Sequence, residues 1–415
     1  MKAKVNGTGA WKDRLSHLGR WSWWALCAVM PVSGRLVPLV LGLAVACVLL
    51  SSIGRPWRLD RNLLWPLSAF YIWHLVGMAW TTDLEFGLFD LQIKAGLVLL
   101  PLAAAVIVQL DPSALRHSML AFTTGSVVAI CLSLWKASVC FGEFGWKECW
   151  TQSYLSYDLH PSYAAWYACW ALLYWGRELI LGRCGQGTFR SLITGAVLLL
   201  LVFAVLLASK SGVLGLLLVI GHLILLVIMR ARGRARILAL TGIAGAAVMG
   251  AWVAGPVVKQ RMMAAVNAVA SALADKDRIA SSSEGNEERL VAWSCSAELI
   301  ASNAWGAGTG DVKHALVDCY EGRGAMDAAA KRLNSHSQFL QGGVALGWIG
   351  LCFALAVVLV PLWLGIRRKQ NLLVLFAALF ALNAAIESVL EVQAGVVLIG
   401  VFIGLLAQGG YKAAE

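Results

Sequence analysis

The sequence predicts an all-α, polytopic integral membrane protein. Of its 415 residues, 59% are hydrophobic and only 14% are charged, and the mean hydropathy is +0.72, whereas soluble domains are roughly 45–50% apolar. Apolar residues run without alternation in stretches such as "AVLLLLVFAVLLA". A β-barrel strand would alternate apolar and polar positions. The spans are therefore expected to be helices, whose backbone polar groups are satisfied within each segment.

Windows of the length that crosses a bilayer, about 20 residues, give about twelve candidate spans. The first is expected to be a retained helix, because no small-residue cleavage site follows it. We expect helices one to nine within residues 1–255, a loop domain at 256–335 and helices ten to twelve within 336–415. The expected spans are residues 19–33, 36–53, 63–80, 94–110, 117–138, 161–181, 191–208, 212–229, 237–255, 336–364, 371–388 and 393–409.

The distribution of charge between the loops predicts their orientation. Lys and Arg concentrate in one alternate set of loops, and most acidic residues fall in the other set. The positive-inside rule then places both termini in the cytoplasm and the long loop of residues 256–335 outside. The net charge of +11 follows mostly from this topology, so it does not indicate nucleic-acid binding. The basic clusters include Arg55, Arg58 and Arg61, then Arg230, Arg232, Arg234 and Arg236, and then Arg367, Arg368 and Lys369.

The outer loop is the one soluble stretch large enough to carry a site. It is expected to begin with an amphipathic helix at residues 256–274 on the membrane surface, because apolar residues recur there at helical spacing. A second helix follows, in which Arg289 and Trp293 lie one turn apart on the same face. The turn "GAGTGD" at residues 306–311 ends it. No Walker lysine follows these glycines, so a nucleotide site is not indicated.

Metal binding is not expected. Asp275 and Asp277 form a D-x-D pair, but the intervening lysine and the polar surroundings favour a solvated patch. No His and Cys residues show zinc-ligand spacing. Cysteines of the outer loops could form disulfides in an oxidising compartment, although sequence alone does not fix their connectivity. The candidate pairs are Cys140 with Cys149 and Cys295 with Cys319.

Five basic residues that are far apart in sequence are expected at the same membrane face: His160, Lys210, Arg261, Arg289 and His336. Cations at this surface favour an anionic ligand, and the bulky anions found there are lipid phosphates. Arg binds phosphate bidentately and Lys supplies a point charge, while a neutral His can accept a proton at physiological pH. Together they suggest group transfer from a lipid-linked phosphate.

Each candidate also has a purely structural interpretation, and three further residues are weaker candidates. Gln338 follows His336 closely, and Glu387 and Glu391 stand four residues apart, near a helix end, where they could orient a cation. The structural alternatives are a solvated helix end for His336, a local ion pair of Arg289 with Glu287 or Glu288, a lipid-surface anchor for Lys210 and Arg261, and a helix start for His160.

Four short motifs together resemble the bacterial O-antigen ligase family: "HSQFLQ" after the long outer loop, "SKSG" between two helices, "HPSY" opening a helix, and "RLVAW" before a Gly-rich turn. The resemblance implies a GT-C-type, inverting, metal-independent glycosyltransferase of the bacterial inner membrane, with no cofactor. Its donor would be a polysaccharide on undecaprenyl pyrophosphate, and its acceptor lipid A-core at the periplasmic face.

The resemblance also assigns roles to individual residues. His336 matches the family's essential histidine and Arg289 its loop arginine. Lys210 stands where the family usually has arginine, which keeps the charge but loses the bidentate fork. Arg289, Lys210 and Arg261 are the candidates for binding pyrophosphate.

Three other functions remain open. An O-antigen polymerase or a protein O-oligosaccharyltransferase of the same superfamily would use the same donor with a different acceptor. A flippase for lipid-linked oligosaccharides is the alternative from another class. A transporter is expected to bury charges near the middle of the membrane. His74 and His222 are the clearest polar residues expected within spans.

Overall fold

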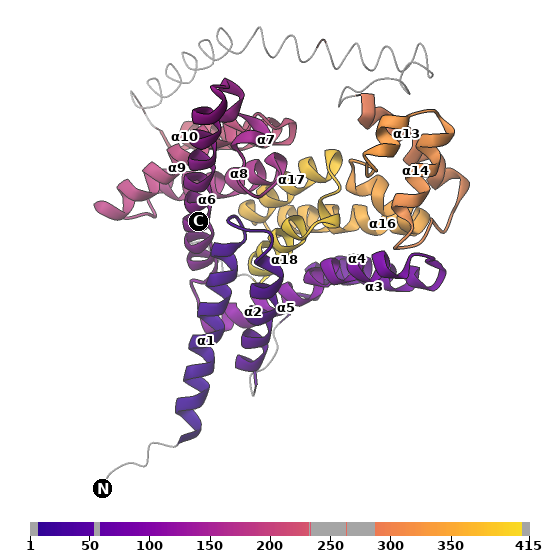
Figure 1. Cartoon of the computed structure of the whole chain (residues 1–415). Coiled ribbons are helices and arrows are strands. Elements are labelled where there is room, and N and C mark those ends of the chain that lie inside the picture. The colour runs from indigo at the N-terminus through magenta and orange to yellow at the C-terminus, as the bar shows by residue number, and fades with distance from the viewer. Residues whose placement is uncertain (1–6, 54–58, 232, 234–262, 264–286, 409–415) are drawn as a thin grey trace.

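The computed structural model describes residues 7–53, 59–231, 233, 263 and 287–408, and every regular element within them is helical (Figure 1). The elements are α1 (Gly7–Val29), α2 (Val37–Ser51), α3 (Arg61–Gly77), η1 (Met78–Trp80), α4 (Leu84–Lys94), α5 (Gly96–Leu110), α6 (Ala114–Phe144), η2 (Lys147–Trp150), α7 (Gln152–Leu155), α8 (Pro161–Ile180), α9 (Thr188–Leu206), α10 (Lys210–Arg230), α13 (Glu287–Ser302), α14 (Val312–Gly322), α15 (Met326–Ala330), α16 (Gln338–Arg367), α17 (Asn371–Ile386), η3 (Val389–Glu391) and α18 (Gln393–Ala407).

The predicted all-α polytopic membrane fold is confirmed. Within the described ranges, six helical segments are long and apolar enough to cross a membrane, and three shorter apolar helices accompany them. Each expected span that lies in the described part of the chain overlaps a helix of the structure, whereas 237–255 cannot be compared. That span and the expected surface helix at 256–274 fall outside the part of the chain that is described. The six long segments are Arg61–Trp80, Leu84–Leu110, Ala114–Phe144, Thr188–Leu206, Lys210–Arg230 and Gln338–Arg367.

Helices α8 and α18 form the centre of the membrane part. All side chains of α18 from Gly395 to Ala407 are buried. Trp170 of α8 has no exposed surface, and its ring centroid lies 4.6 Å from that of Phe376 and 5.4 Å from that of Phe402. Large aromatic side chains bury much apolar area and pack in such edge-on pairs. This core supports the end of the bundle where the polar residues gather.

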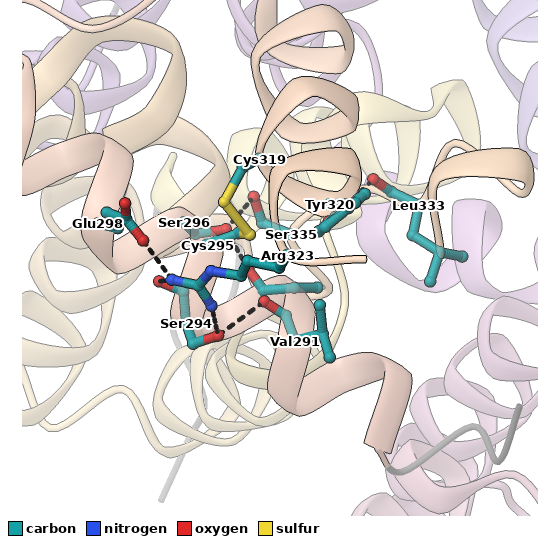
Figure 2. Close-up of a disulfide and its surroundings, with 11 residues drawn as sticks. Val291, Ser294, Cys295, Ser296, Glu298, Cys319, Tyr320, Arg323, Leu333 and Ser335 are labelled. Atoms are coloured by element: carbon teal, nitrogen blue, oxygen red, sulfur yellow. Dashed lines mark hydrogen bonds and ion pairs between the residues drawn. A yellow bond between two sulfur atoms is a disulfide. The ribbon is translucent and has the colours of Figure 1, made fainter. Parts of the chain in front are cut away.

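Helices α13, α14 and α15 form a small unit with its own core around Leu316, and in Figure 1 they lie on the opposite side of the molecule from α9 and α10. The Cys295–Cys319 disulfide joins α13 to α14 (Figure 2). Beside it, the guanidinium of Arg323 donates a hydrogen bond to the carboxylate of Glu298. The unit is thus closed by a covalent bond, and its core also includes Val344, Ala345 and Leu346 of α16.

Both cysteine pairings considered from the sequence are present. Besides the bond in Figure 2, Cys140 at the end of α6 is bonded to Cys149 in η2. Their Cα atoms are 5.8 Å apart, and those of Cys295 and Cys319 are 5.9 Å apart, which is the usual separation in a disulfide.

A buried carboxylate fastens the small helical unit to the membrane helices. Asp311 accepts hydrogen bonds from the backbone N–H of Thr82 at 2.6 Å, its hydroxyl at 2.7 Å and the N–H of Asp83 at 2.9 Å. Burial acts to raise the pKa of Asp311, but these bonds outweigh it and lower the pKa below the ordinary value. Nearby, the Thr309 hydroxyl donates to the carbonyl of His74 at 2.6 Å.

A break in α16 provides the second attachment. At Leu346 and Gly347 the backbone leaves helical geometry, and Gly347 has φ +65°. A broken helix leaves backbone groups without their usual partners, and the Gly-rich turn at residues 304–308 supplies them. These glycines therefore have a structural role. The bonds are Ala307 N to Val344 O at 2.8 Å, Gly308 N to Ala345 O at 2.9 Å and Trp348 N to Ala304 O at 3.2 Å.

Replacing Gly347 with alanine should destabilise the protein by roughly 1–3 kcal/mol. A Cβ at this position would lie 1.8 Å from the Ala304 carbonyl oxygen, and the backbone is left-handed. Gly322→Ala is the matched control, because its Cβ would meet no atom within 4 Å. Thermal unfolding of the purified variants should show a lower midpoint for Gly347→Ala alone. Equal midpoints would mean that the turn does not hold the break in place.

Candidate active site

The polar residues gather at one end of the helical bundle, where α8, α10 and α16 begin and α17 ends. His160 is the N-cap of α8, and Ser209 is the N-cap of α10. His336 lies two residues before α16, and Glu387 directly follows α17. Helix ends present unpaired backbone groups and polar caps at the membrane surface, so the topology brings together residues that are far apart in sequence.

The Glu387 carboxylate is the centre of this cluster. Its Oε1 accepts a hydrogen bond from the Arg289 guanidinium at 2.9 Å and another from the Ser162 hydroxyl at 3.2 Å. Its Oε2 lies 3.6 Å from Nδ1 of His336. Arg289 also donates to the carbonyl of Ile386. One carboxylate thus holds a histidine and an arginine side by side.

The charge of Glu387 is stabilised by these neighbours. Burial acts to raise its pKa, but His336 and Arg289 outweigh burial and lower the pKa to about 2. Glu387 is therefore ionised throughout the physiological range. An ionised carboxylate facing Nδ1 favours the tautomer of His336 that carries its proton on that nitrogen. The second ring nitrogen, Nε2, is then available to accept a proton.

The backbone of His336 adopts an uncommon conformation, with φ +44°. A residue other than glycine keeps a left-handed backbone only where its surroundings hold it there. Its N–H donates to Asn334 Oδ1 at 2.9 Å, and its carbonyl accepts from the Trp293 indole at 3.4 Å. Arg289 and Trp293 are expected on one face of their helix, and both lie close to His336. Arg289 contacts its partner Glu387, and Trp293 contacts its backbone carbonyl.

The "SKSG" turn reaches the cluster through its serines. The Ser209 hydroxyl donates to Ser162 at 3.2 Å, and Ser162 in turn donates to Glu387. Ser211 lies 3.0 Å from Ser209. Lys210 is exposed at the first position of α10. Lys210 stands out in the sequence because of its charge, whereas in the structure the two serines of the motif, which are helix-capping residue types, connect it to the cluster.

His160 belongs to the same electrostatic environment. Its Nδ1 accepts from the Ser162 N–H at 3.4 Å, so it also serves as the helix start considered from sequence. Burial lowers the pKa of His160, and Glu387 opposes this by raising it. The charges of Arg289 and His336 lower it further. His160 is therefore favoured in its neutral form.

A second polar network lies next to the first, and its buried lysine was not anticipated. Gln338 donates from Nε2 to Glu391 Oε1 at 3.2 Å. The other oxygen of Glu391 is 2.8 Å from Nζ of Lys94, which also contacts Asp90 at 2.5 Å. His74 Nδ1 is 3.5 Å from Asp90. Asp90 and Lys94, one helical turn apart in an apolar stretch, were the available sequence signal.

Two expectations about carboxylates differ from the structure. Glu387 and Glu391 do not share a helix face, because α17 ends at Ile386 and the chain continues extended into a short 3₁₀ turn. They contact different cations, Arg289 and Lys94. The local pairing considered for Arg289 is also not the one observed. Its partner is Glu387, whereas Glu288 is paired with Lys331.

Some expectations concern residues whose positions are not described. Arg261, the third candidate for binding pyrophosphate, is one of them, and Asp275 and Asp277 are others. Within the described ranges, no three His, Cys, Asp or Glu side chains are grouped in the way that a metal site requires.

The fold and the cluster define a multi-pass helical membrane protein with a His–carboxylate–Arg site at the ends of its helices. A family model described as O-antigen ligase matches residues 195–355, which include Lys210, Arg289 and His336. This part of the chain is thus similar to the O-antigen ligase family, in agreement with the resemblance expected from the short motifs within it. Glu387 lies beyond the matched residues. Among curated proteins, none matches the chain.

Neutralising Glu387 should cost stability in a pH-dependent way. Its pKa is about 2 in the folded protein, compared with about 4.3 when unfolded, so its ionised form contributes roughly 3 kcal/mol at neutral pH. This contribution is complete above the unfolded pKa and is lost as pH falls toward 2. Glu387→Gln should therefore lower the unfolding midpoint of purified protein at pH 7 and 5, with a smaller difference at pH 3.

The matched control is Glu298→Gln, which breaks the exposed ion pair with Arg323. Exposed pairs contribute little to stability, so this change should be small at every pH. Similar effects of the two substitutions would contradict the central role given to Glu387.

Proposed function

We propose that this protein is an O-antigen ligase of the bacterial inner membrane. It transfers a polysaccharide from undecaprenyl pyrophosphate to the terminal sugar of lipid A-core at the periplasmic face. The observation that carries the proposal is the Glu387 carboxylate, which holds a proton acceptor, His336, beside a phosphate-binding residue type, Arg289. The family domain over residues 195–355 supports it. The face and the orientation follow from the distribution of charge in the loops.

In the proposed reaction, His336 is the general base. A hydroxyl oxygen of the acceptor sugar attacks the anomeric carbon of the donor while its proton passes to Nε2 of His336. Glu387 stabilises the positive charge that then develops on the ring, as carboxylates do for other catalytic histidines. A positioned histidine typically contributes about 10²–10⁴-fold to such a step. Attack opposite the leaving group inverts the anomeric carbon.

The leaving group gains negative charge as the glycosidic oxygen separates from the sugar. Arg289 has donors to spare, because a guanidinium carries five N–H groups and its contacts to Glu387 and Ile386 use two of its nitrogens. The remaining donors can bind pyrophosphate, and Lys210 and Arg261 are the further cations that the sequence offers for it. Preorganised donors of this kind are worth roughly 3–4 kcal/mol each, so the proposed mechanism needs no metal ion.

One observation supports the transporter alternative, and two others argue against it. Lys94 and Asp90 are buried charges in a membrane segment, as a transporter would require. Lys94, however, pairs with Glu391 beside the candidate active site, and the matched family domain includes the histidine and arginine of that site. These contacts favour a transferase.

Purified protein should join a lipid-pyrophosphate-linked polysaccharide to lipid A-core without nucleotide or ion gradient. His336→Ala should lower the rate by about 10²–10⁴-fold, because the base is lost. His314→Ala is the matched control, since this exposed histidine lies in the same loop. Chelator should leave the rate unchanged. A rate that disappears with chelator and returns with Mg²⁺ would contradict a metal-independent mechanism.

The acceptor distinguishes a ligase from its superfamily relatives. Cells that lack this protein should still build long lipid-linked polymer but fail to attach it to lipid A-core, which gel analysis of their lipopolysaccharide would reveal. Single repeat units on lipid A-core would instead identify a polymerase. Loss of glycan from proteins alone would identify a protein O-oligosaccharyltransferase.

A further inference from the structure

Lys94 is a buried cation that the proposed reaction does not use. It is the last residue of α4, and its side chain has no exposed surface. Removing an ammonium group from water costs several kcal/mol unless it is paired. Its two partners are Asp90, one turn earlier in the same helix, and Glu391, which is almost 300 positions further along the chain. Because burying this charge is unfavourable, we looked for a role of Lys94 beyond packing.

The contact with Glu391 leads to the start of α16. Glu391 Oε1 accepts from Gln338 Nε2 at 3.2 Å, and Gln338 Oε1 accepts from the Leu390 N–H at 2.6 Å. Both ends of the Gln338 amide are therefore held, and its side chain is fully buried. Gln338 is the first residue of α16 and stands two positions after His336.

His336 depends on such restraints because its backbone is left-handed, with φ +44°. Before it, Ser335 is held by Gln341, which accepts from its N–H at 3.1 Å, and by the Ser296 hydroxyl at 2.9 Å. After it, Ser337 makes no side-chain cap, and the Gln338 amide restrains that side together with the Trp293 indole, which donates to the His336 carbonyl. Two contacts, from Lys94 to Glu391 and from Glu391 to Gln338, thus connect Lys94 to the segment of the candidate base.

The charge on Glu391 strengthens this chain. Burial acts to raise the pKa of Glu391, but Lys94 and the hydrogen bonds around the carboxylate lower it below the ordinary value. An ionised acceptor makes a shorter and stronger hydrogen bond than a neutral one. The other partner of Lys94, Asp90, faces His74 at 3.5 Å, whereas Glu391 is the partner that accepts from Gln338.

We propose that Lys94 is a positioning residue for His336, acting through Glu391 and Gln338. The inference rests on the proposed role of His336 as the base. Two carboxylates share one lysine, and Glu391 is the one that accepts a hydrogen bond from Gln338. Removing either leaves Lys94 with a single partner, so the two changes are matched in charge but differ in their effect on Gln338.

Glu391→Ala should lower kcat by about 10–100-fold with little change in KM, because small displacements of a catalytic group are costly. Lys94→Met should have the same effect. Asp90→Ala should leave kcat within about threefold of wild type. Glu391→Gln should recover part of the loss, since its amide oxygen can still accept from Gln338. Thermal unfolding of each variant checks that the protein is folded.

A second measurement does not depend on transfer. Diethyl pyrocarbonate modifies histidine rings, and mass spectrometry of the peptide that contains His336 gives its rate of modification. That rate should change in Glu391→Ala and remain at the wild-type value in Asp90→Ala. Equal changes in the two variants, in kcat and in modification, would show that Lys94 serves folding alone. Absence of transfer by wild-type protein would contradict the proposed function, while the modification rates would still decide this inference.

Discussion

The carboxylate of Glu387 is the interaction on which the candidate site depends. It joins Ser162 at the start of α8, Arg289 of α13 and His336 before α16, segments that no local preference would bring together. Burying a carboxylate is unfavourable unless its oxygens are well satisfied. Two hydrogen bonds to one oxygen and a histidine facing the other meet this need. The site therefore forms only when the membrane helices and the loop unit are assembled.

The framework around Glu387 fixes the two elements that carry its partners. The loop unit is attached by Asp311 to the start of the α4 segment and by residues 304–308 to α16. Below the site, the aromatic core around Trp170 leaves little room for movement. Positioning of charged groups by rigid neighbours reduces the reorganisation needed during a reaction. The arrangement thus suits a chemical step that uses positioned charges.

Much of the fold could be predicted because the membrane restricts the possibilities. Long apolar stretches can only be helices in lipid, and the expected spans fall on helices wherever the chain is described. The gathering of His160, Arg289 and His336 at one end also followed from helix order and loop charge. The pairing of cysteines was left open by the sequence, and the structure joins both candidate pairs.

The rest of the site depends on long-range packing, which sequence spacing does not encode. Spacing of four residues suggested a shared face for Glu387 and Glu391, but the helix ends before them. Lys94 appeared to begin a span, whereas its partner Glu391 comes from a distant part of the chain. The left-handed backbone of His336 was not predicted: one of its contacts, with Asn334, is local, but the other, with Trp293, comes from a different helix.

The break in α16 also limits how this architecture can vary in evolution. Residues 304–308 complete the hydrogen bonds of a membrane helix, so the loop unit is not a cassette that could be exchanged on its own. In a hybrid that combined this unit with another protein's helices, residues 304–308 would face a helix break shaped for a different turn, and its backbone groups would lose their partners. Recombination would succeed only if the first half of α16 travelled with the unit. Variation at the candidate site is then expected through single substitutions and not through the shuffling of domains.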